Sequence, residues 1–223
     1  EHMPGWLLPM DPGTVGRARS AVPLSHAAPD PADLPAIVAR YRDRGFTPAF
    51  RLPELPAFQS VATALHAQGW RREQPTLTQT ATVADLLALP EGPGAVLAAR
   101  PDAGWTAMFL GEGFDPVDGA SRSAALGRAQ GTLFASVVEG GETLACGAAS
   151  YSHGWLGVHG MRTAAARRGQ GLAARLLRAM AAEAQRQGID RVFLQVDAGN
   201  APAQALYRRA GFTTAWAYAY HRV

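Results

Sequence analysis

The sequence predicts an α/β protein with a mixed sheet, because helix-like and strand-like segments alternate along most of its length. The clearest helix follows Gly171: Leu172, Leu176 and Met180 recur on one face, and Gly188 ends the pattern. A short apolar strand at 191–196, another helix and an alternating strand complete the chain. We therefore expect an α+β arrangement in which this helix packs against a sheet.

The remaining elements follow from apolar periodicity and from glycine and proline positions. The expected helices are 33–44, 56–68, 105–111, 118–130 and 200–210. The expected strands are 48–52, 76–83, 131–138, 142–152, 155–161, 191–196 and 212–223. Two of these strands flank Glu139-Gly-Gly-Glu142, which predicts a hairpin turn.

The order helix, glycine, strand, helix, glycine, aromatic residue and strand occurs twice. The helices end at Gly45 and Gly69 in the first copy and at Gly188 and Gly211 in the second, at nearly equal intervals. This pattern predicts a diverged internal repeat.

We expect the first repeat, residues 1–88, to be a partial and structural unit, and the second, residues 95–223, to be the active one. The first repeat has Ala28-Pro29 where the second has its glycine turn, and Leu65 where the second has Tyr207. The proline- and glycine-rich residues 89–94 form the expected junction.

Composition excludes several classes of protein. A net charge of +3 does not indicate a nucleic-acid-binding protein, and no apolar run approaches the ~20 residues that span a bilayer. The sequence lacks the features of a secretory leader. Cys146 is the single cysteine, which excludes an intrachain disulfide and favours a cytoplasmic location. Its apolar neighbours predict that it packs in the core.

The glycine-rich segment Arg168-Gly-Gln-Gly-Leu-Ala173 opens the clearest helix. Glycines there allow left-handed backbone angles, and the first helical N–H groups have no partner within the helix. Such a turn is typical of phosphate binding. Residues 167–209 also hold eight arginines against three acidic residues, which suits an anionic ligand.

One phosphate ligand to consider is a dinucleotide. Gly169-x-Gly171-x-x-Ala174 fits the G-x-G-x-x-G/A pattern, and Asp197 follows at a strand end. In that fold, however, the glycine turn follows its strand directly, whereas here 163–168 intervene, and too few residues remain for the rest of the sheet. An NAD-binding oxidoreductase is therefore an alternative that leaves much of the sequence unexplained.

A different family accounts for both halves of this region. Arg168-x-x-Gly171-x-Ala173 resembles the [QR]-x-x-G-x-[GA] signature of the GNAT acetyltransferases. The segment Asn200-x-x-Ala-x-x-Leu-Tyr207-x-x-x-Gly211-Phe resembles the second motif of that superfamily, in the expected order and spacing. The resemblance is close over 145–223. It implies the GNAT fold and transfer of an acetyl group from acetyl-CoA to an amine.

The resemblance also implies roles for particular residues. The strand end before the turn would offer backbone groups to the pantetheine arm, and the turn would bind the pyrophosphate. Asn200 would touch the coenzyme. The coenzyme-binding candidates are Met161, Arg162, Thr163, Arg168, Gly169, Gln170, Gly171, Leu172, Ala173 and Asn200.

The catalytic candidates are Tyr207 and His159. Tyr207 stands at the motif position of a general acid, and its usual pKa of about 10 keeps it protonated at neutral pH. His159 is the candidate base, and Glu112, Asp115 and Asp118 are acids that could border a cationic acceptor.

No metal-ligand spacing occurs. The expected acceptor is a small-molecule or peptide amine, reached in a ternary complex. A non-catalytic acyl-CoA sensor or scaffold remains the alternative from another class.

Overall fold

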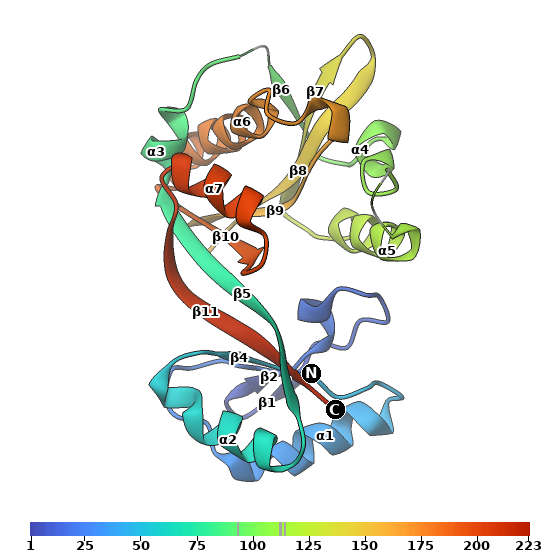
Figure 1. Cartoon of the computed structure of the whole chain (residues 1–223), viewed down its shortest axis with the longest axis vertical. Coiled ribbons are helices and arrows are strands. Elements are labelled where there is room, and N and C mark those ends of the chain that lie inside the picture. Colours follow the sequence, from blue (N-terminus) through green and yellow to red (C-terminus); the bar gives the residue numbers. More distant parts are fainter. Residues whose placement is uncertain (93, 112, 114) are drawn as a thin grey trace. The chain divides into compact units, whose positions relative to one another are not determined.

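The computed structural model describes residues 1–92, 94–111, 113 and 115–223. Contacts divide the chain into two units, each described separately (Figure 1). Unit 1 comprises Glu1–Thr78, Val196–Asn200 and Thr214–Val223, and unit 2 comprises Gln79–Gln195 and Ala201–Thr213. Pro93, in the predicted junction, and Glu112, one of the predicted acids, lie outside the described residues.

In unit 1, a small sheet of β1 (His2–Met3), β2 (Trp6–Leu7) and β3 (Val22–Pro23) lies near the start of the chain. The helices are α1 (Leu34–Asp43) and α2 (Gln59–Ala67), with 3-10 turns η1 (Gly16–Arg19), η2 (Pro31–Asp33) and η3 (Pro56–Phe58). Strand β11 (Thr213–Arg222) lies between β4 (Phe50–Pro53) and β5 (Arg71–Thr82). Trp6, Ile37, Phe50 and Leu65 belong to one buried apolar cluster.

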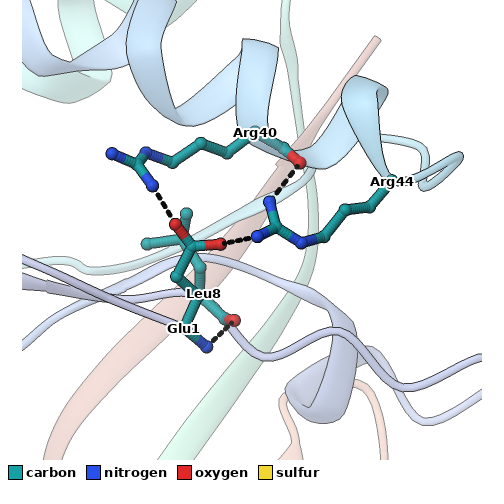
Figure 2. Close-up of polar contacts among 4 residues, drawn as sticks. All are labelled: Glu1, Leu8, Arg40 and Arg44. Atoms are coloured by element: carbon teal, nitrogen blue, oxygen red, sulfur yellow. Dashed lines mark hydrogen bonds and ion pairs between the residues drawn. The ribbon is translucent and has the colours of Figure 1, made fainter.

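Glu1 fixes the start of the chain to α1. Its carboxylate forms ion pairs with Arg40 and Arg44, and its ammonium group donates to the carbonyl of Leu8 at 3.1 Å (Figure 2). These are surface contacts, and such pairs contribute about 0–1 kcal/mol each.

Unit 2 contains a mostly antiparallel sheet in the order β10-β9-β8-β7-β6. Its strands are β6 (Ala95–Ala98), β7 (Thr132–Glu139), β8 (Glu142–Ser152), β9 (Trp155–Thr163) and β10 (Arg191–Asp197). Its helices are α3 (Val83–Leu87), α4 (Ala103–Ala107), α5 (Pro116–Gly127), α6 (Leu172–Arg186) and α7 (Ala201–Arg209), with the 3-10 turn η4 (Ala165–Arg167).

Helices α4 and α6 cover opposite faces of this sheet (Figure 1). On the α4 face, Trp105 and Phe109 pack with Phe134, Cys146 and Ala148. On the α6 face, the buried side of the helix consists of Leu172, Leu176, Leu177, Met180, Ala181 and Ala184. The sheet is thus buried on both sides in its middle strands.

Most of the predicted elements are confirmed, including the hairpin of β7 and β8. Cys146 is fully buried and packs in the core as expected. The short elements β1, β2, β3, α3 and β6 were not predicted, and α4 begins and ends earlier than its predicted range. No helix among the described residues is both long enough and apolar enough to cross a membrane.

The contact-based units differ from the predicted boundaries at 1–88 and 95–223. Strand β11 belongs mainly to unit 1 because Tyr218–His221 pair with the first-repeat strand β4. The repeat boundary concerns the order of elements along the sequence, and it stays a prediction.

The glycines that motivated the repeat share one backbone geometry. Gly45, Gly69, Gly188 and Gly211 all have φ between 70° and 89°. After each glycine, the next N–H donates to a carbonyl five residues earlier: Phe46 to Tyr41, Trp70 to Leu65, Ile189 to Ala184 and Phe212 to Tyr207. Each helix therefore ends in the same Schellman motif, and Leu65 is the counterpart of Tyr207.

Candidate functional site

The glycine turn before α6 has the backbone that anion binding requires. Gly169 and Gly171 have φ of 77° and 75°, and Gly171 is the N-cap of α6, with no side-chain cap. Both glycines are exposed, and a Cβ at either would meet no atom within 4 Å. The first amides of α6 are therefore open to a ligand, at the end of the helix where the dipole favours negative charge.

The side chains around the turn brace it. One carboxylate oxygen of Glu139, at the end of β7, accepts from Arg167 at 2.7 Å, and the other accepts from Arg175 at 3.1 Å. Arg167 also donates to the side chain of Gln170 at 3.0 Å. Since Arg167 precedes the turn and Arg175 follows it, Glu139 fixes both ends of the turn to the hairpin.

Most of the arginines that form the predicted basic surface are paired with carboxylates. Besides the arginines held by Glu139, Arg178 pairs with Glu91, Arg186 with Glu183 and Arg191 with Asp190. Arg168 is exposed and makes no ion pair within the described part of the chain. Its side chain is therefore available to an anion at the turn, together with the backbone amides.

A β-bulge shapes the strand that leads to the turn. In the pairing of β8 with β9, Cys146 lies opposite Arg162 and Ala148 opposite His159. Gly147 alone thus faces two β9 residues, Gly160 and Met161, and Gly160 has a φ of 59°. The extra residue is a bulge, which changes the face to which the following side chains point.

The bulge brings His159 and Arg162 to one face of the sheet. Residues three apart on a regular strand point to opposite faces, whereas these two lie opposite Cys146 and Ala148, which both belong to the α4-side core. The Arg162 guanidinium accordingly lies 4.9 Å from the ring centroid of Phe109.

The Met161 side chain lies on the opposite face of the sheet, which α6 covers. A Cβ on Gly147 would approach the sulfur of Met161 at 2.5 Å and the terminal carbon of Met180 at 2.9 Å. Gly147 therefore makes room for Met161 beneath α6. Because this side chain packs beneath α6, only the backbone groups of Met161 can contact a ligand at the end of β9.

Strand β9 also separates from β10 before it ends. The register between these parallel strands covers Trp155–Val158 of β9 and Arg191–Leu194 of β10. Beyond Val158, β9 continues to Thr163 and keeps its pairing with β8. The strand edge at Met161–Thr163 thus has backbone groups that β10 does not pair with.

His159 is held in a packed position. Its Nε2 lies 2.9 Å from the hydroxyl oxygen of Ser150, and its ring meets that of Phe193 edge to face, with centroids 5.9 Å apart. Gly157 makes this possible, because a Cβ there would lie 2.7 Å from the His159 Nε2. The Ser150 hydroxyl can donate to a neutral imidazole or accept from it, so the contact sets the orientation of the ring.

Tyr207 lies on α7 and is 8% exposed. Its ring packs edge to face on Phe212, with centroids 5.7 Å apart. Burial raises the pKa of Tyr207, and the positive charge of Arg162 acts in the opposite direction. Within the described residues its hydroxyl makes no hydrogen bond. The group is therefore a protonated donor at neutral pH that is available to a ligand.

Burial likewise lowers the pKa of Arg162, and the charge of Arg122 acts in the same direction. The predicted acids have local roles: Asp115 caps α5 by accepting from the Asp118 N–H at 2.7 Å, and Asp118 pairs with Arg122 at 2.6 Å. The negative charge of Asp118 acts in the opposite direction and raises the pKa of Arg162.

Three of the coenzyme candidates differ in how far they are exposed and in the unit to which they belong. The Leu172 side chain is buried in the core at 2% exposure, so only its backbone can meet a ligand. Ala173, in the first turn of α6, is half-buried. Asn200 is exposed, directly precedes α7 and belongs to unit 1, whereas the other candidates belong to unit 2.

Sequence reasoning missed the role of Glu139 and the bulge. Glu139 was assigned only to a hairpin turn, and Gly147 and Gly160 gave no signal beyond being glycines in strands. Among the described residues, no group of three or more His, Cys, Asp or Glu side chains could hold a metal ion.

The family model described as "Probable histone acetyltransferase Rv0428c C-terminal" matches residues 1–221. Among solved structures, the chain is similar to a GCN5-related N-acetyltransferase from Kribbella flavida, with 20% identity and a TM-score of 0.67 over 92% of this chain and 81% of that one. No curated protein matches the chain.

Two further structures are similar over 92% of this chain. A GCN5-related N-acetyltransferase from Sphaerobacter thermophilus has 21% identity and a TM-score of 0.63, with 72% of its own chain covered. A tandem GNAT protein from the clavulanic acid biosynthesis pathway has 16% identity and a TM-score of 0.65, with 74% covered. At these identities the structural similarities concern the fold alone.

Proposed function

Because the chain belongs to the family described as probable histone acetyltransferase Rv0428c C-terminal, within the GNAT acetyltransferases, we propose that it transfers an acetyl group from acetyl-CoA directly to a primary amine. Membership of this family makes it an acyltransferase. The donor, the amine and the ternary complex are the proposed parts. The observation that carries the proposal is the uncapped, left-handed Gly171 at the start of α6.

The proposed donor site runs from the end of β9 to the first turn of α6. Amides from Gly169 to Ala173 bind the pyrophosphate, and Arg168 adds a positive charge. Backbone groups of Met161, Arg162 and Thr163 bind the pantetheine arm, because this strand edge is not paired with β10. The brace at Glu139 holds the turn in place before the ligand arrives, which reduces the ordering cost of binding.

In the proposed reaction, the amine nitrogen forms a bond to the thioester carbon as the carbon–sulfur bond breaks. As that bond breaks, the leaving sulfur takes the proton of the Tyr207 hydroxyl, and the tyrosinate regains a proton from solvent before the next turnover. The sulfur of an intact thioester is hardly basic and becomes basic only as the carbon–sulfur bond breaks, so this transfer accompanies bond breaking rather than preceding it. The pKa shift of Tyr207 keeps the donor protonated throughout the neutral range.

The acceptor must lose a proton before or during attack. We assign this role to His159, whose neutral imidazole accepts a proton directly or through water. Ser150 and Phe193 fix the orientation of the ring. Asn200 remains a candidate coenzyme contact, which we propose from its position in the sequence motif.

Ligand binding is the first test. Acetyl-CoA, free CoA and NADH are compared in thermal unfolding; a ligand at 100 times its dissociation constant stabilises the fold by about 2.7 kcal/mol. A shift with both CoA species and none with NADH supports the donor assignment. A shift with NADH alone would instead favour the dinucleotide alternative.

Turnover is the second test. Release of free thiol from acetyl-CoA is followed with a histone peptide, because the family description names a histone acetyltransferase, and with a set of small amines and amino acids. Amine-dependent thiol release supports the enzyme. Binding of acetyl-CoA without turnover on any amine would favour the sensor or scaffold alternative.

A further inference from the structure

Unit 1 carries a cluster of cations on one face of strands β4 and β11. In their antiparallel pairing, Arg51 lies opposite Tyr220 and Phe50 opposite His221. Phe50 and Leu52 point into the apolar cluster with α1 and α2. Since side chains alternate along a strand, Arg51 and Tyr220 point to the other face.

Arg51 is a largely buried cation for which the described residues provide no anion. Its Nε is buried and has no hydrogen-bond partner among the described residues, and no described carboxylate pairs with its guanidinium. The guanidinium carbon lies 5.4 Å from the ring centroid of Tyr218. Burial lowers the pKa of Arg51, and Arg17, a charge of the same sign, acts in the same direction.

The tyrosines around Arg51 do not supply the missing charge. Burial raises the pKa of Tyr220 to about 12, and it also raises the pKa of Tyr41. These phenols are neutral at physiological pH, so they can donate or accept a hydrogen bond but cannot neutralise a guanidinium. A buried, unpaired charge is costly, so the arrangement calls for an anion from outside the chain.

A cavity of about 260 Å³ lies along the same strands. Its lining includes Ala49, which directly precedes β4 and lies two residues before Arg51, and Arg222, two residues after Tyr220 on β11. Arg19 and the Thr14 and Thr47 side chains also line it. Period-two spacing puts Arg222 on the face of β11 that carries Tyr220, which lies opposite Arg51, and Ala49 leads directly into β4.

The lining is cationic as well as polar. Arg222 pairs with Glu73 at 3.1 Å, whereas Arg19 donates to the neutral carbonyl of Gly13 at 3.2 Å. Glu73 therefore compensates Arg222, whereas no carboxylate among the described residues forms an ion pair with Arg19 or Arg51. Guanidinium groups bind carboxylate and phosphate through paired N–H donors.

We propose that this face of unit 1 is a binding site for a small oxyanion, a carboxylate or a phosphate group, with Arg51 as its buried anchor and Arg19 at the cavity. The site belongs entirely to unit 1 and uses none of the residues assigned to acetyl transfer. The proposal therefore stands independently of the proposed function.

The test compares thermal unfolding in inorganic phosphate, in succinate and in sodium chloride at matched ionic strength. The wild-type protein is expected to show a saturable rise in Tm with phosphate or succinate beyond that with chloride, and the more effective anion identifies the group. Phosphate can also bind at the glycine turn, so the titration is repeated in Gly171→Asp, where an added carboxylate repels anions. The rise is expected to persist there.

The deciding variant is Arg51→Met, which keeps the side-chain volume and removes the charge. It is expected to weaken anion binding by about tenfold or more and, without anion, to melt no lower than wild type, because a buried unpaired charge is gone. Arg51→Lys, which keeps the charge and loses the paired donors, is expected to bind with intermediate affinity. Arg40→Met, on the surface of α1, is the control that leaves anion binding unchanged.

Other outcomes overturn the proposal. An Arg51→Met protein that melts well below wild type and retains the anion effect would show that Arg51 is structural. Loss of the anion effect in Gly171→Asp but not in Arg51→Met would assign the effect to the glycine turn. No saturable effect of either anion on wild type would remove the site altogether.

Discussion

The indole Nε1 of Trp105 donates a buried hydrogen bond of 3.0 Å to the carbonyl oxygen of Gly147. Gly147 is the β8 residue opposite the bulge, where the regular sheet ladder is interrupted. A buried carbonyl at such an interruption needs another donor, and α4 provides it. Trp105 thus stabilises the bulge that places His159 and Arg162 on one face.

We expect Trp105→Phe to destabilise unit 2 by about 2–3 kcal/mol, because it leaves a buried carbonyl unsatisfied and removes part of a buried ring. The phenyl ring still packs on Phe109 and Phe134, so the fold persists. Urea unfolding at neutral pH measures the change. The rate of acetyl transfer is expected to fall as well, because a shift of the bulge would move His159 and Arg162.

Trp155→Phe is the matched control. Its ring contacts are with Phe193 and the guanidinium of Arg191, and its indole makes no hydrogen bond within the described residues. The expected loss of stability is below about 1 kcal/mol. Equal losses in the two variants would show that the hydrogen bond to Gly147 contributes nothing.

Tyr207→Phe tests the general acid. Because the Tyr207 hydroxyl makes no hydrogen bond within the described residues, its removal should change the stability by less than about 0.5 kcal/mol. The turnover number should fall by about 10²-fold or more, the usual contribution of a positioned proton donor. Steady-state kinetics with saturating acetyl-CoA measures it, and turnover within about threefold of wild type would disprove the role.

Tyr151→Phe is the control for this substitution. Its hydroxyl donates to the Met180 carbonyl at 3.2 Å on the α6 face. Loss of that bond should cost about 1 kcal/mol of stability and leave turnover unchanged. We therefore expect the two substitutions to have opposite effects. Tyr207→Phe should lower turnover without lowering stability, and Tyr151→Phe should lower stability without lowering turnover.

The sequence was sufficient for the elements that carry strong periodicity. Helix α6 could be located because its apolar face repeats regularly and Gly171 and Gly188 mark its ends. The elements β1, β2 and β3 could not, because strands of two residues have too few positions to show alternation. They form because β2 pairs with both β1 and β3 in the folded chain.

The candidate site was predicted unevenly for a similar reason. The glycine turn and Tyr207 belong to local motifs, so the resemblance to the GNAT acetyltransferases could single them out from the sequence. The bulge at Gly160 depends on the partner strand β8, and the hydrogen bonds of Glu139 depend on Arg167 and Arg175, which lie far along the chain. A single sequence carries no signal for such pairs.

Gly171→Ala and Gly188→Ala form a matched pair at the two ends of α6. Their φ angles are 75° and 70°, and a Cβ at either would meet nothing within 4 Å. Each substitution should therefore cost about 1–2 kcal/mol for the left-handed backbone alone. In Gly171→Ala, the turn can relax, and CoA binding must restore it, which should weaken affinity by up to about tenfold.

Gly188→Ala should leave CoA affinity unchanged, because Gly188 lies at the opposite end of the helix. Isothermal titration with CoA and urea unfolding together measure the pair. Unchanged affinity in Gly171→Ala, at an equal loss of stability, would mean that the turn conformation does not matter for the coenzyme.

Alkaline pH should destabilise the protein through Cys146. Burial raises the pKa of this thiol from 9.0 to about 12, so the folded chain keeps a proton that the unfolded chain releases. The stability from this difference is complete below pH 9 and is lost as the pH rises toward 12. The tyrosines with raised pKa values titrate from 10.0 when unfolded, so their effects begin at higher pH.

Between pH 8 and pH 10, ionisation of the unfolded thiol should lower the free energy of unfolding by about 1.4 kcal/mol. Urea unfolding at the two pH values measures the loss. In Cys146→Ala, the stability at pH 8 should be lower because a small cavity replaces the sulfur. The loss between pH 8 and pH 10 should be about 1.4 kcal/mol smaller than in wild type, and the part that remains comes from the tyrosines with raised pKa values. An unchanged pH dependence in this variant would mean that another group controls the alkaline transition.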